Sequence, residues 1–165
     1  MSAADLIETL GGAGPALAEV LAERAEIMRL SQAAHDAVLL PHAPGGISHA
    51  ERAALAARMA RWHRDEALEV HYRERLAKAG EISTLAAVAT GAAPAQAAQD
   101  ARLRAIIRHV DLVTLAPKDA TKADIAALVA AGVAEPDIVR LAELIAFVNY
   151  QVRVIAGLRL LEAAK

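Results

Sequence analysis

Apolar residues recur at helical spacing along most of this chain, whereas runs of Val, Ile and Thr that would favour strands are scarce. The clearest case is the segment 101–115, whose apolar positions are Leu103, Ile106, Ile107, Val110 and Val113. This spacing places the apolar side chains on one face of a helix, which can then pack against a core. The pattern therefore predicts an amphipathic helix over this segment, closed by Pro117.

Two segments carry a capping box, which is a sequence signature of a helix start. In the first, Ser48 is followed one turn later by Glu51, and in the second Thr121 is followed by Asp124. The hydroxyl accepts a hydrogen bond from a backbone N–H of the first turn, and the acidic side chain accepts one from the residue that bears the hydroxyl. A helix is predicted to begin directly after each hydroxyl residue, and the first of them is expected to run to about Trp62.

Proline and glycine mark the remaining helix boundaries, because proline starts or stops a helix and glycine commonly ends one. These signals predict further helices over 15–24, 26–40, 63–79, 83–90 and 136–161, and residues 6–10 form a short apolar segment that ends at Gly11-Gly12. Residues 92–98 are rich in Ala, Gln and Pro, which indicates a linker. In the last helix, apolar residues surround the whole circumference, so we expect much of it to be buried.

Composition supports an all-α fold. Alanine makes up about a quarter of the 165 residues, which favours helix over strand, and aromatic residues account for only 2%. The length suits one domain with a sizeable core. We therefore expect a single helical domain.

The distribution of charge argues against several classes of partner. The net charge is −2, and acidic and basic residues are interspersed, so the chain has no strong field for nucleic acid or a membrane surface. The first residues lack a basic segment before an apolar stretch, and no apolar run is judged long enough to span a bilayer. These features predict a cytoplasmic protein.

Cysteine is absent from the whole sequence. Its absence excludes disulfides, thiolate nucleophiles and zinc sites with Cys ligands. Of all the features of the sequence, this one restricts the possible chemistry most.

The second half of the chain carries a closely spaced series of motifs. In order, they are Thr121-Lys122-Ala123-Asp124, Leu128-Val129-Ala130-Ala131-Gly132, Asp137-Ile138 and Phe147-Val148-Asn149-Tyr150-Gln151-Val152-Arg153. The series resembles the C-terminal half of peroxidase-related proteins in the alkylhydroperoxidase D / carboxymuconolactone decarboxylase superfamily. The opening Asp5-Leu6-Ile7-Glu8-Thr9-Leu10 resembles a Cys-poor subgroup of the same class. The resemblance extends back through Gly46-Ile47-Ser48-His49-Ala50-Glu51-Arg52 and covers roughly 45–161.

This resemblance implies an all-α, alkylhydroperoxidase D-like helical domain over 45–165, preceded by an N-terminal helical extension over 1–44. It also implies a homo-oligomer, a trimer or a hexamer, since members of the class usually assemble in that way. A Cys-containing relative of the same class is a further candidate partner.

In the peroxidase branch of this family, a Glu precedes a Cys-x-x-Cys motif and a His follows it. One thiolate attacks the peroxide, the other resolves the sulfenic acid, and Glu and His handle protons. Aligning that layout on His71 puts Arg64 and Ala67 at the two cysteine positions, and Arg52, beside Glu51, at the acidic one.

A shift of that alignment by one residue puts Asp65 and Leu68 at the cysteine positions and Tyr72 at the histidine. Neither alignment contains a thiol, so the resemblance carries over the fold and not the dithiol chemistry. The decarboxylase branch acts without thiols, but no complete catalytic set from that branch matches this chain.

His71 and Glu51 are the candidates for catalytic groups. His71 has an ordinary pKa near neutrality and could handle a proton, although it could equally be a half-exposed helix residue. Glu51 could serve as a proton relay, but its place in a capping box already explains it. His63 would share a face with His71 if their helix were continuous, but no His-Glu-x-x-His pattern is present. We predict no metal site and no cofactor; the other four histidines are assigned no role.

Asn149, Tyr150 and Arg153 are the candidates for ligand binding. Asn149 and Arg153 lie one turn apart on an otherwise apolar helix, which indicates that the guanidinium lies in or beside the core. A buried guanidinium needs an anion, which could be Asp137 or Glu143 of the same helix, a carboxylate of another chain, or a ligand. The alternative is a structural cluster that fixes helix packing.

Three functions fit these observations. The first is an auxiliary or degenerate member that keeps the fold without thiol peroxidase activity. The second is a non-redox, decarboxylase-like enzyme that binds a small carboxylate near His71 and Arg153. The third is a small-molecule binding module.

Overall fold

The computed structural model describes residues 6–80 and 83–164, and within these ranges the chain forms helices and no strands. The helices are α1 (Leu6–Gly11), α2 (Pro15–Ala22), α3 (Ala25–Leu39), α4 (His49–Trp62), α5 (Glu66–Lys78), α6 (Ser83–Ala89), α7 (Pro94–Ala97), α8 (Ala101–Leu115), α9 (Lys122–Ala130) and α10 (Glu135–Ala163), with a short 3-10 helix, η1 (Pro117–Asp119). The predicted all-α fold is confirmed.

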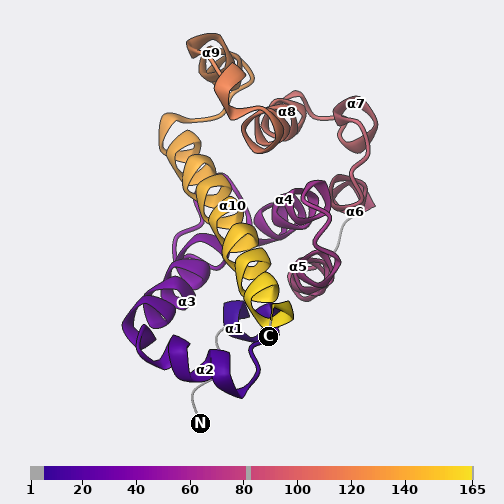
Figure 1. The fold of residues 1–165 in the computed structure, drawn as a ribbon. Helices are drawn as coiled ribbons and strands as arrows, with labels where there is room; N and C mark the ends of the chain where they lie inside the picture. Colours follow the sequence, from indigo (N-terminus) through magenta and orange to yellow (C-terminus); the bar gives the residue numbers. More distant parts are fainter. Residues whose placement is uncertain (1–5, 81–82, 165) are drawn as a thin grey trace.

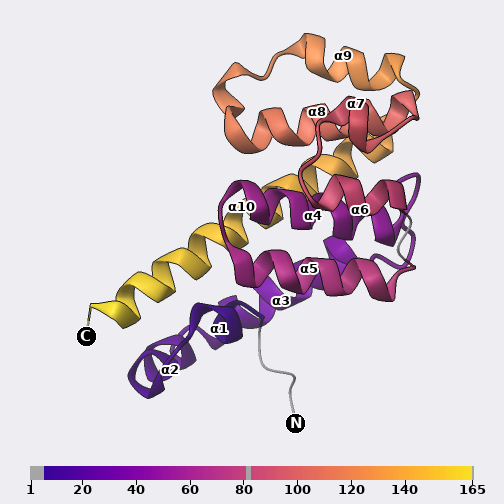
Figure 2. The same cartoon turned by 90° about the vertical axis from the view of Figure 1, so that its right-hand side faces the viewer.

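The helices form three groups along α10 (Figures 1 and 2). Helices α4, α5 and α6 pack together in the middle, α7, α8 and α9 lie beyond them on one side, and α1, α2 and α3 lie on the other. Helix α10 contacts α1, α3, α4, α8 and α9, and so connects all three groups.

Both predicted capping boxes are present, at Ser48 and at Thr121. Two boundaries differ from the sequence prediction. Residues Pro94–Ala97 form a short helix in the segment expected to be a linker, because the fixed φ of Pro94 suits a first helical turn and because Ala97 is buried. The helical stretch after Trp62 is also not continuous: a turn at Arg64, with φ of 59°, separates α4 from α5.

Helix α4 is the most enclosed helix of the described chain, since every residue from 52 to 60 is buried. Five of these nine residues are alanines, whose small side chains let neighbouring helices approach closely. Helices α5, α6, α8 and α10 pack around it. Two arginines, Arg52 and Arg58, are nonetheless buried in this helix.

Arg58 connects α4 to two other parts of the fold. Its Nε and Nη2 donate to the two carboxylate oxygens of Asp111 on α8, at 2.6 and 2.7 Å. Its Nη1 donates to the backbone carbonyls of Val88 and Ala92, around the end of α6. Trp62 donates its indole N–H to the same Asp111 carboxylate, at 2.7 Å, and its ring lies 5.1 Å from the Arg58 guanidinium carbon. The buried charge is thus neutralised by a bidentate ion pair.

Arg52 binds the loop between α3 and α4. Its three guanidinium nitrogens donate to the carbonyl oxygens of Val38, Pro44 and Ile47, at 2.8–3.0 Å. Burial, together with the nearby charge of Arg140, lowers the pKa of Arg52, yet a guanidinium stays charged at any pH that a folded protein tolerates. Arg52 therefore stays charged and needs these carbonyl oxygens as hydrogen-bond partners. This requirement holds the loop against α4.

The exposure of α10 differs from the prediction. Its buried face includes Leu144, Val148 and Ile155, but Val139 on another face is 59% exposed and Leu160 is 72% exposed. The expectation that apolar residues all round the helix meant burial all round is wrong. The physical reason is that the other helices cover only part of its circumference.

Helix α10 is also long and apolar enough to cross a membrane, judged by length and composition alone: it has 29 residues, and its most apolar stretch has a mean hydropathy of 1.4. The sequence prediction that no segment reaches such a length is corrected by this helix. One such helix is weak support for a membrane span, because the core helix of a globular fold meets the same two criteria. Here 39% of that stretch is buried against the rest of the chain.

We expect Arg58→Met to lower the free energy of unfolding by about 3 kcal/mol or more, because it leaves the Asp111 carboxylate without its buried cation. Urea denaturation followed by circular dichroism measures the change. Arg29→Met is the matched control, since Arg29 pairs with Glu26 in solvent, with side chains 64% and 67% exposed, and should change the free energy of unfolding far less than Arg58→Met does. Equal losses for the two variants would contradict the role given to Arg58.

Candidate functional site

Helices α3, α5 and α10 bring four rings together in the interior. The His71 ring centroid lies 5.2 Å from that of Tyr72 and 5.7 Å from that of His35. His35 also stacks on Tyr72, at 6.2 Å, and meets the edge of Phe147, at 6.0 Å. His35, Tyr72 and Phe147 are buried, and His71 is half-buried. The predicted catalytic candidate His71 therefore belongs to an interior aromatic cluster.

Gln151 of α10 completes this cluster. The Tyr72 hydroxyl donates to the Gln151 side-chain oxygen, and both side chains are fully buried. Burial raises the pKa of Tyr72 far above its usual range, so the phenol stays protonated and remains a donor. In this cluster, Nε2 of Gln151 and Nε2 of His71 are enclosed and have no hydrogen-bond partner among the described residues. The cluster thus holds unused hydrogen-bonding capacity.

The protonation state of His71 limits what it can do. Burial, reinforced by His35, Arg75 and Lys78, lowers the pKa of His71 to about 4. The imidazole is therefore neutral at pH 7. A group with so low a pKa is a weak general base at neutral pH, because catalytic efficiency is greatest when the pKa lies near the working pH.

The turn between α4 and α5 contains a second buried polar contact. Asp65, which is 5% exposed, caps α5 by accepting the backbone N–H of Leu68 at 3.1 Å. The same carboxylate receives two hydrogen bonds from Arg159 of α10, at 2.9 and 3.2 Å. Arg159 in turn donates to the Leu10 carbonyl at the end of α1. One ion pair thus connects the turn to both ends of the chain.

The two sequence alignments of the redox motif fall on different faces of α5. Asp65, Leu68 and Tyr72 are all buried, whereas Arg64 and Ala67 are exposed. The shifted alignment is therefore the one whose positions face the interior. Its two cysteine positions are occupied by a carboxylate held in an ion pair and by a leucine in the core.

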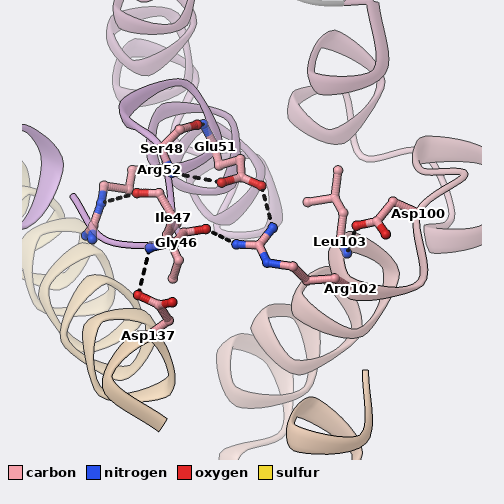
Figure 3. A network of polar contacts seen from close by, with 9 residues as sticks. All are labelled: Gly46, Ile47, Ser48, Glu51, Arg52, Asp100, Arg102, Leu103 and Asp137. Carbon is pink, nitrogen blue, oxygen red and sulfur yellow. Dashed lines mark hydrogen bonds and ion pairs between the residues drawn. The ribbon is translucent and has the colours of Figure 1, made fainter. Parts of the chain in front are cut away.

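Glu51, the second catalytic candidate, lies in a different network (Figure 3). One of its oxygens accepts the backbone N–H of Ser48, and the other accepts a hydrogen bond from Arg102 of α8, each at 2.8 Å. Arg102 also donates to the Gly46 carbonyl, and the Gly46 N–H donates to Asp137 of α10, at 2.9 Å. The structure holds Glu51 in contacts that join α4, α8 and the loop before α4.

Gly46 explains why this loop can approach α10 so closely. A Cβ on this residue would collide with the Asp137 carboxylate, so a larger residue would force either the Asp137 side chain or the loop to shift. Asp137 also pairs with Arg140, at 2.8 Å. It is therefore not the partner of Arg153 that the sequence suggested.

The predicted ligand residues of α10 are divided between two environments. The Tyr150 hydroxyl forms a hydrogen bond with Ser31 of α3, at 2.9 Å, and its ring lies 6.0 Å from Phe147, next to the aromatic cluster. Asn149 lies on the other side, where its Oδ1 meets Nε2 of His63 at 2.8 Å. Because α4 ends at this histidine, His63 is not on one continuous helix face with His71.

Arg153 is exposed, and the prediction that it lies in or beside the core is wrong. Its Nη1 donates to the Asn149 carbonyl, at 2.7 Å, and to the Asn149 side-chain oxygen, at 3.3 Å. Across the described ranges, no carboxylate forms an ion pair with it, and neither Asp137 nor Glu143 does so. The reason is that the face of α10 that carries Arg153 borders an open cleft and not the core.

This cleft has a volume of about 460 Å³ and lies between α8, α9 and α10. Its walls are largely apolar and include Val113, Ile125 and Ile145. Arg153, Asn149 and His109 supply polar groups. Over the described residues, no group of three or more His, Asp or Glu side chains is placed to hold a metal ion.

Two features of these sites were not found in the sequence. His35 and Gln151 were assigned no role, although both are buried and both contact the cluster around Tyr72. One signal was present for His35: it lies on the same face of its helix as Leu39, one turn later, which is also buried. A polar side chain on a buried helix face has to find a polar or aromatic neighbour.

No family model matches the chain, and no curated protein matches it. The chain is similar in fold to solved structures, among them two peroxidase-related proteins. An uncharacterized peroxidase-related protein from Silicibacter sp. TM1040 superposes with a TM-score of 0.69 at 20% identity, over 81% of this chain and 68% of that one. An alkylhydroperoxidase AhpD core, an uncharacterized peroxidase-related protein from Ralstonia eutropha JMP134, superposes with a TM-score of 0.56 at 24% identity, over 89% of this chain and 76% of that one.

We expect the folded protein to lose stability as the pH falls from about 7 to about 4. In the unfolded chain His71 takes up a proton near its ordinary pKa of 6.5, whereas in the folded chain it resists protonation down to about 4. Its contribution is therefore fully present above 6.5 and is lost as the pH falls towards 4. Allowing for its partial exposure, this amounts to about 1 kcal/mol.

Urea denaturation at pH 7 and at pH 5 tests this expectation. His71→Gln should reduce the difference in unfolding free energy between the two pH values, while the same change at the exposed His42 should not. An unchanged pH dependence in His71→Gln would show that the imidazole titrates alike in both states.

Proposed function

We propose that this chain is a Cys-less member of the alkylhydroperoxidase D-like class that keeps the fold without thiol peroxidase activity and acts as an auxiliary protein. The helical fold is shared with the two peroxidase-related structures. The proposal concerns what the chain does with that fold. It rests on the residues that occupy the place of the dithiol.

The observation that carries the proposal is the environment of Asp65 and Leu68. Asp65 caps α5 and pairs with Arg159, so its carboxylate has a structural role. A carboxylate also cannot replace a thiolate in dithiol redox chemistry. Leu68 is fully buried and contributes only to packing. Nearby, Tyr72 stands where the alignment expects a histidine, and its phenol remains protonated at neutral pH. The three positions support stability rather than turnover.

Self-association fits the exposed apolar surface. Val139 is 59% exposed, Leu160 72% and Leu161 57%, all on α10, and Leu115 at the end of α8 is 59% exposed. Leu160 and Leu161 are adjacent near the C-terminal end of α10, whereas Val139 lies near its other end, so the adjacent pair is the part of this surface best suited to an interface. We therefore propose a cytoplasmic homo-oligomer, a trimer or hexamer, with a Cys-containing relative as a second candidate partner and the 1–44 segment as its N-terminal extension.

The decarboxylase-like alternative needs acid–base groups that converge on a cavity. His71 is enclosed with a pKa of about 4, and Glu51 is engaged with Arg102 and Ser48. These contacts favour the non-catalytic function over the enzyme. The binding-module alternative draws support from the cleft beside Arg153.

We expect no saturable consumption of hydrogen peroxide or an alkyl hydroperoxide by the purified protein with a lipoyl or thioredoxin reductant, because no residue can form a sulfenic acid. A coupled assay of reductant oxidation measures this. A heat-denatured sample sets the background. Turnover that saturates with peroxide and disappears on denaturation would refute the proposal.

Light scattering at micromolar concentration should give the mass of a trimer or hexamer. Leu160→Glu combined with Leu161→Glu should shift the distribution towards smaller species, because two charges would have to be desolvated at the interface. Val20→Glu on α2 is the control for a charge placed on an exposed apolar position elsewhere. A monodisperse wild-type monomer would remove the oligomer from the proposal.

A further inference from the structure

The cleft between α8, α9 and α10 lies apart from the aromatic cluster and from the turn that carries Asp65. Helix α9 contacts α8 and α10 and stands away from the α4–α6 group (Figure 1). The space between these helices, about 460 Å³, is in the range of pockets that hold small molecules. The proposed auxiliary function does not use it.

The walls of the cleft are apolar. Val113 comes from α8, Ile125 from α9, and Ile145 from α10, with alanines between them. Ile125 is 42% exposed, so its side chain presents apolar surface to water in the isolated chain. A hydrocarbon group placed in the cleft would remove that surface from water, which is favourable in proportion to the area covered.

Arg153 provides a fixed positive charge at this apolar cleft. Only its Nη1 is engaged, with Asn149 one turn earlier. Its Nε and Nη2 make no hydrogen bond to any described residue, so one edge of the guanidinium fork is available. A guanidinium keeps its charge at all relevant pH values, and its fork suits a carboxylate, which can accept two parallel hydrogen bonds.

His109 adds a second polar group to the same cleft. Burial lowers the pKa of His109, so the ring is neutral at pH 7. Its Nδ1 is enclosed and has no hydrogen-bond partner within the described ranges. A neutral imidazole can donate or accept, so it can contact a polar substituent of a ligand without adding charge.

From this arrangement we infer that the cleft binds a monocarboxylate with an apolar body, an arylacetate or a medium-chain alkanoate. The carboxylate lies against the free edge of Arg153, and the hydrocarbon lies against Ile125 and Ile145. One guanidinium balances one negative charge, so a phosphate or dicarboxylate would leave charge uncompensated beside apolar walls. The inference goes beyond the proposed function, because binding of this kind needs neither a thiol nor turnover.

Isothermal titration of the full chain with phenylacetate and with hexanoate tests the inference. We expect saturable binding of both, and at least tenfold weaker binding of acetate, which lacks the apolar body, and of hexanamide, which lacks the charge. Arg153→Gln should weaken hexanoate binding at least tenfold. Arg29→Gln on α3 removes an exposed arginine elsewhere and should leave the affinity unchanged.

Ala146→Phe supplies an independent variant, since Ala146 is exposed and lines the cleft, so that a larger side chain fills the space without entering the core. It should abolish hexanoate binding while leaving the thermal melt unchanged. Absence of saturable binding by the wild type would overturn the inference, as would equal binding of hexanoate by Arg153→Gln.

A second copy of the chain is the competing occupant of the cleft. If it fills the cleft, Ala146→Phe will change the mass measured by light scattering and the wild type will not bind either acid, which also overturns the inference. The peroxide assay reports on the proposed function separately, because neither Arg153 nor Ala146 contacts the positions of the lost dithiol.

Discussion

Two arginines of α4, Arg52 and Arg58, are buried, and their guanidinium groups cannot lose their charge. The surrounding helices and loops therefore have to supply hydrogen-bond and ion-pair partners for them. Arg58 needs Asp111, which fixes α8 against α4, and its remaining donors take carbonyls at the end of α6. Arg52 needs carbonyl oxygens at the end of α3 and in the loop that follows it. Gly46 of the same loop donates its N–H to Asp137, which holds the loop against α10. Because an unpaired buried cation costs several kcal/mol, the α3–α4 loop, α6, α8 and α10 have little freedom to dock differently.

That constraint explains which parts of the structure the sequence could predict. The starts of α4 and α9 depend on Ser48 and Thr121, whose partners lie within one helical turn, so they could be read locally. The role of Arg58 depends on Asp111, far along the chain, and an arginine in a helix gives no sign of such a partner. The prediction that Arg153 lies in or beside the core was wrong for the same reason. Apolar neighbours in sequence do not reveal which face of α10 the other helices leave uncovered.

The candidate site was partly predictable for a related reason. The missing cysteines and the candidacy of His71 follow from residue types alone. The choice between the two alignments does not, because it depends on which face of α5 turns inward, and only packing against α4 decides that. Once the fold places Asp65, Leu68 and Tyr72 inward, their chemistry follows from burial: the carboxylate takes Arg159, the leucine packs, and the phenol takes Gln151.

The cleft beside Arg153 and the positions that align with the dithiol of the peroxidase branch are built from different helices. The cleft is lined by residues between His109 and Arg153, from α8, α9 and α10, and α5 contributes none of them. The hydrogen bond between His63 and Asn149 links the turn before α5 to the cleft wall, and neither residue occupies a cysteine position in either alignment. Under the proposed function, a carboxylate and a leucine at the dithiol positions, and the ion pair of Asp65 with Arg159, therefore leave the apolar walls of the cleft and the guanidinium of Arg153 in place. The proposed auxiliary function and the proposed binding of a small carboxylate thus rest on separate parts of the fold.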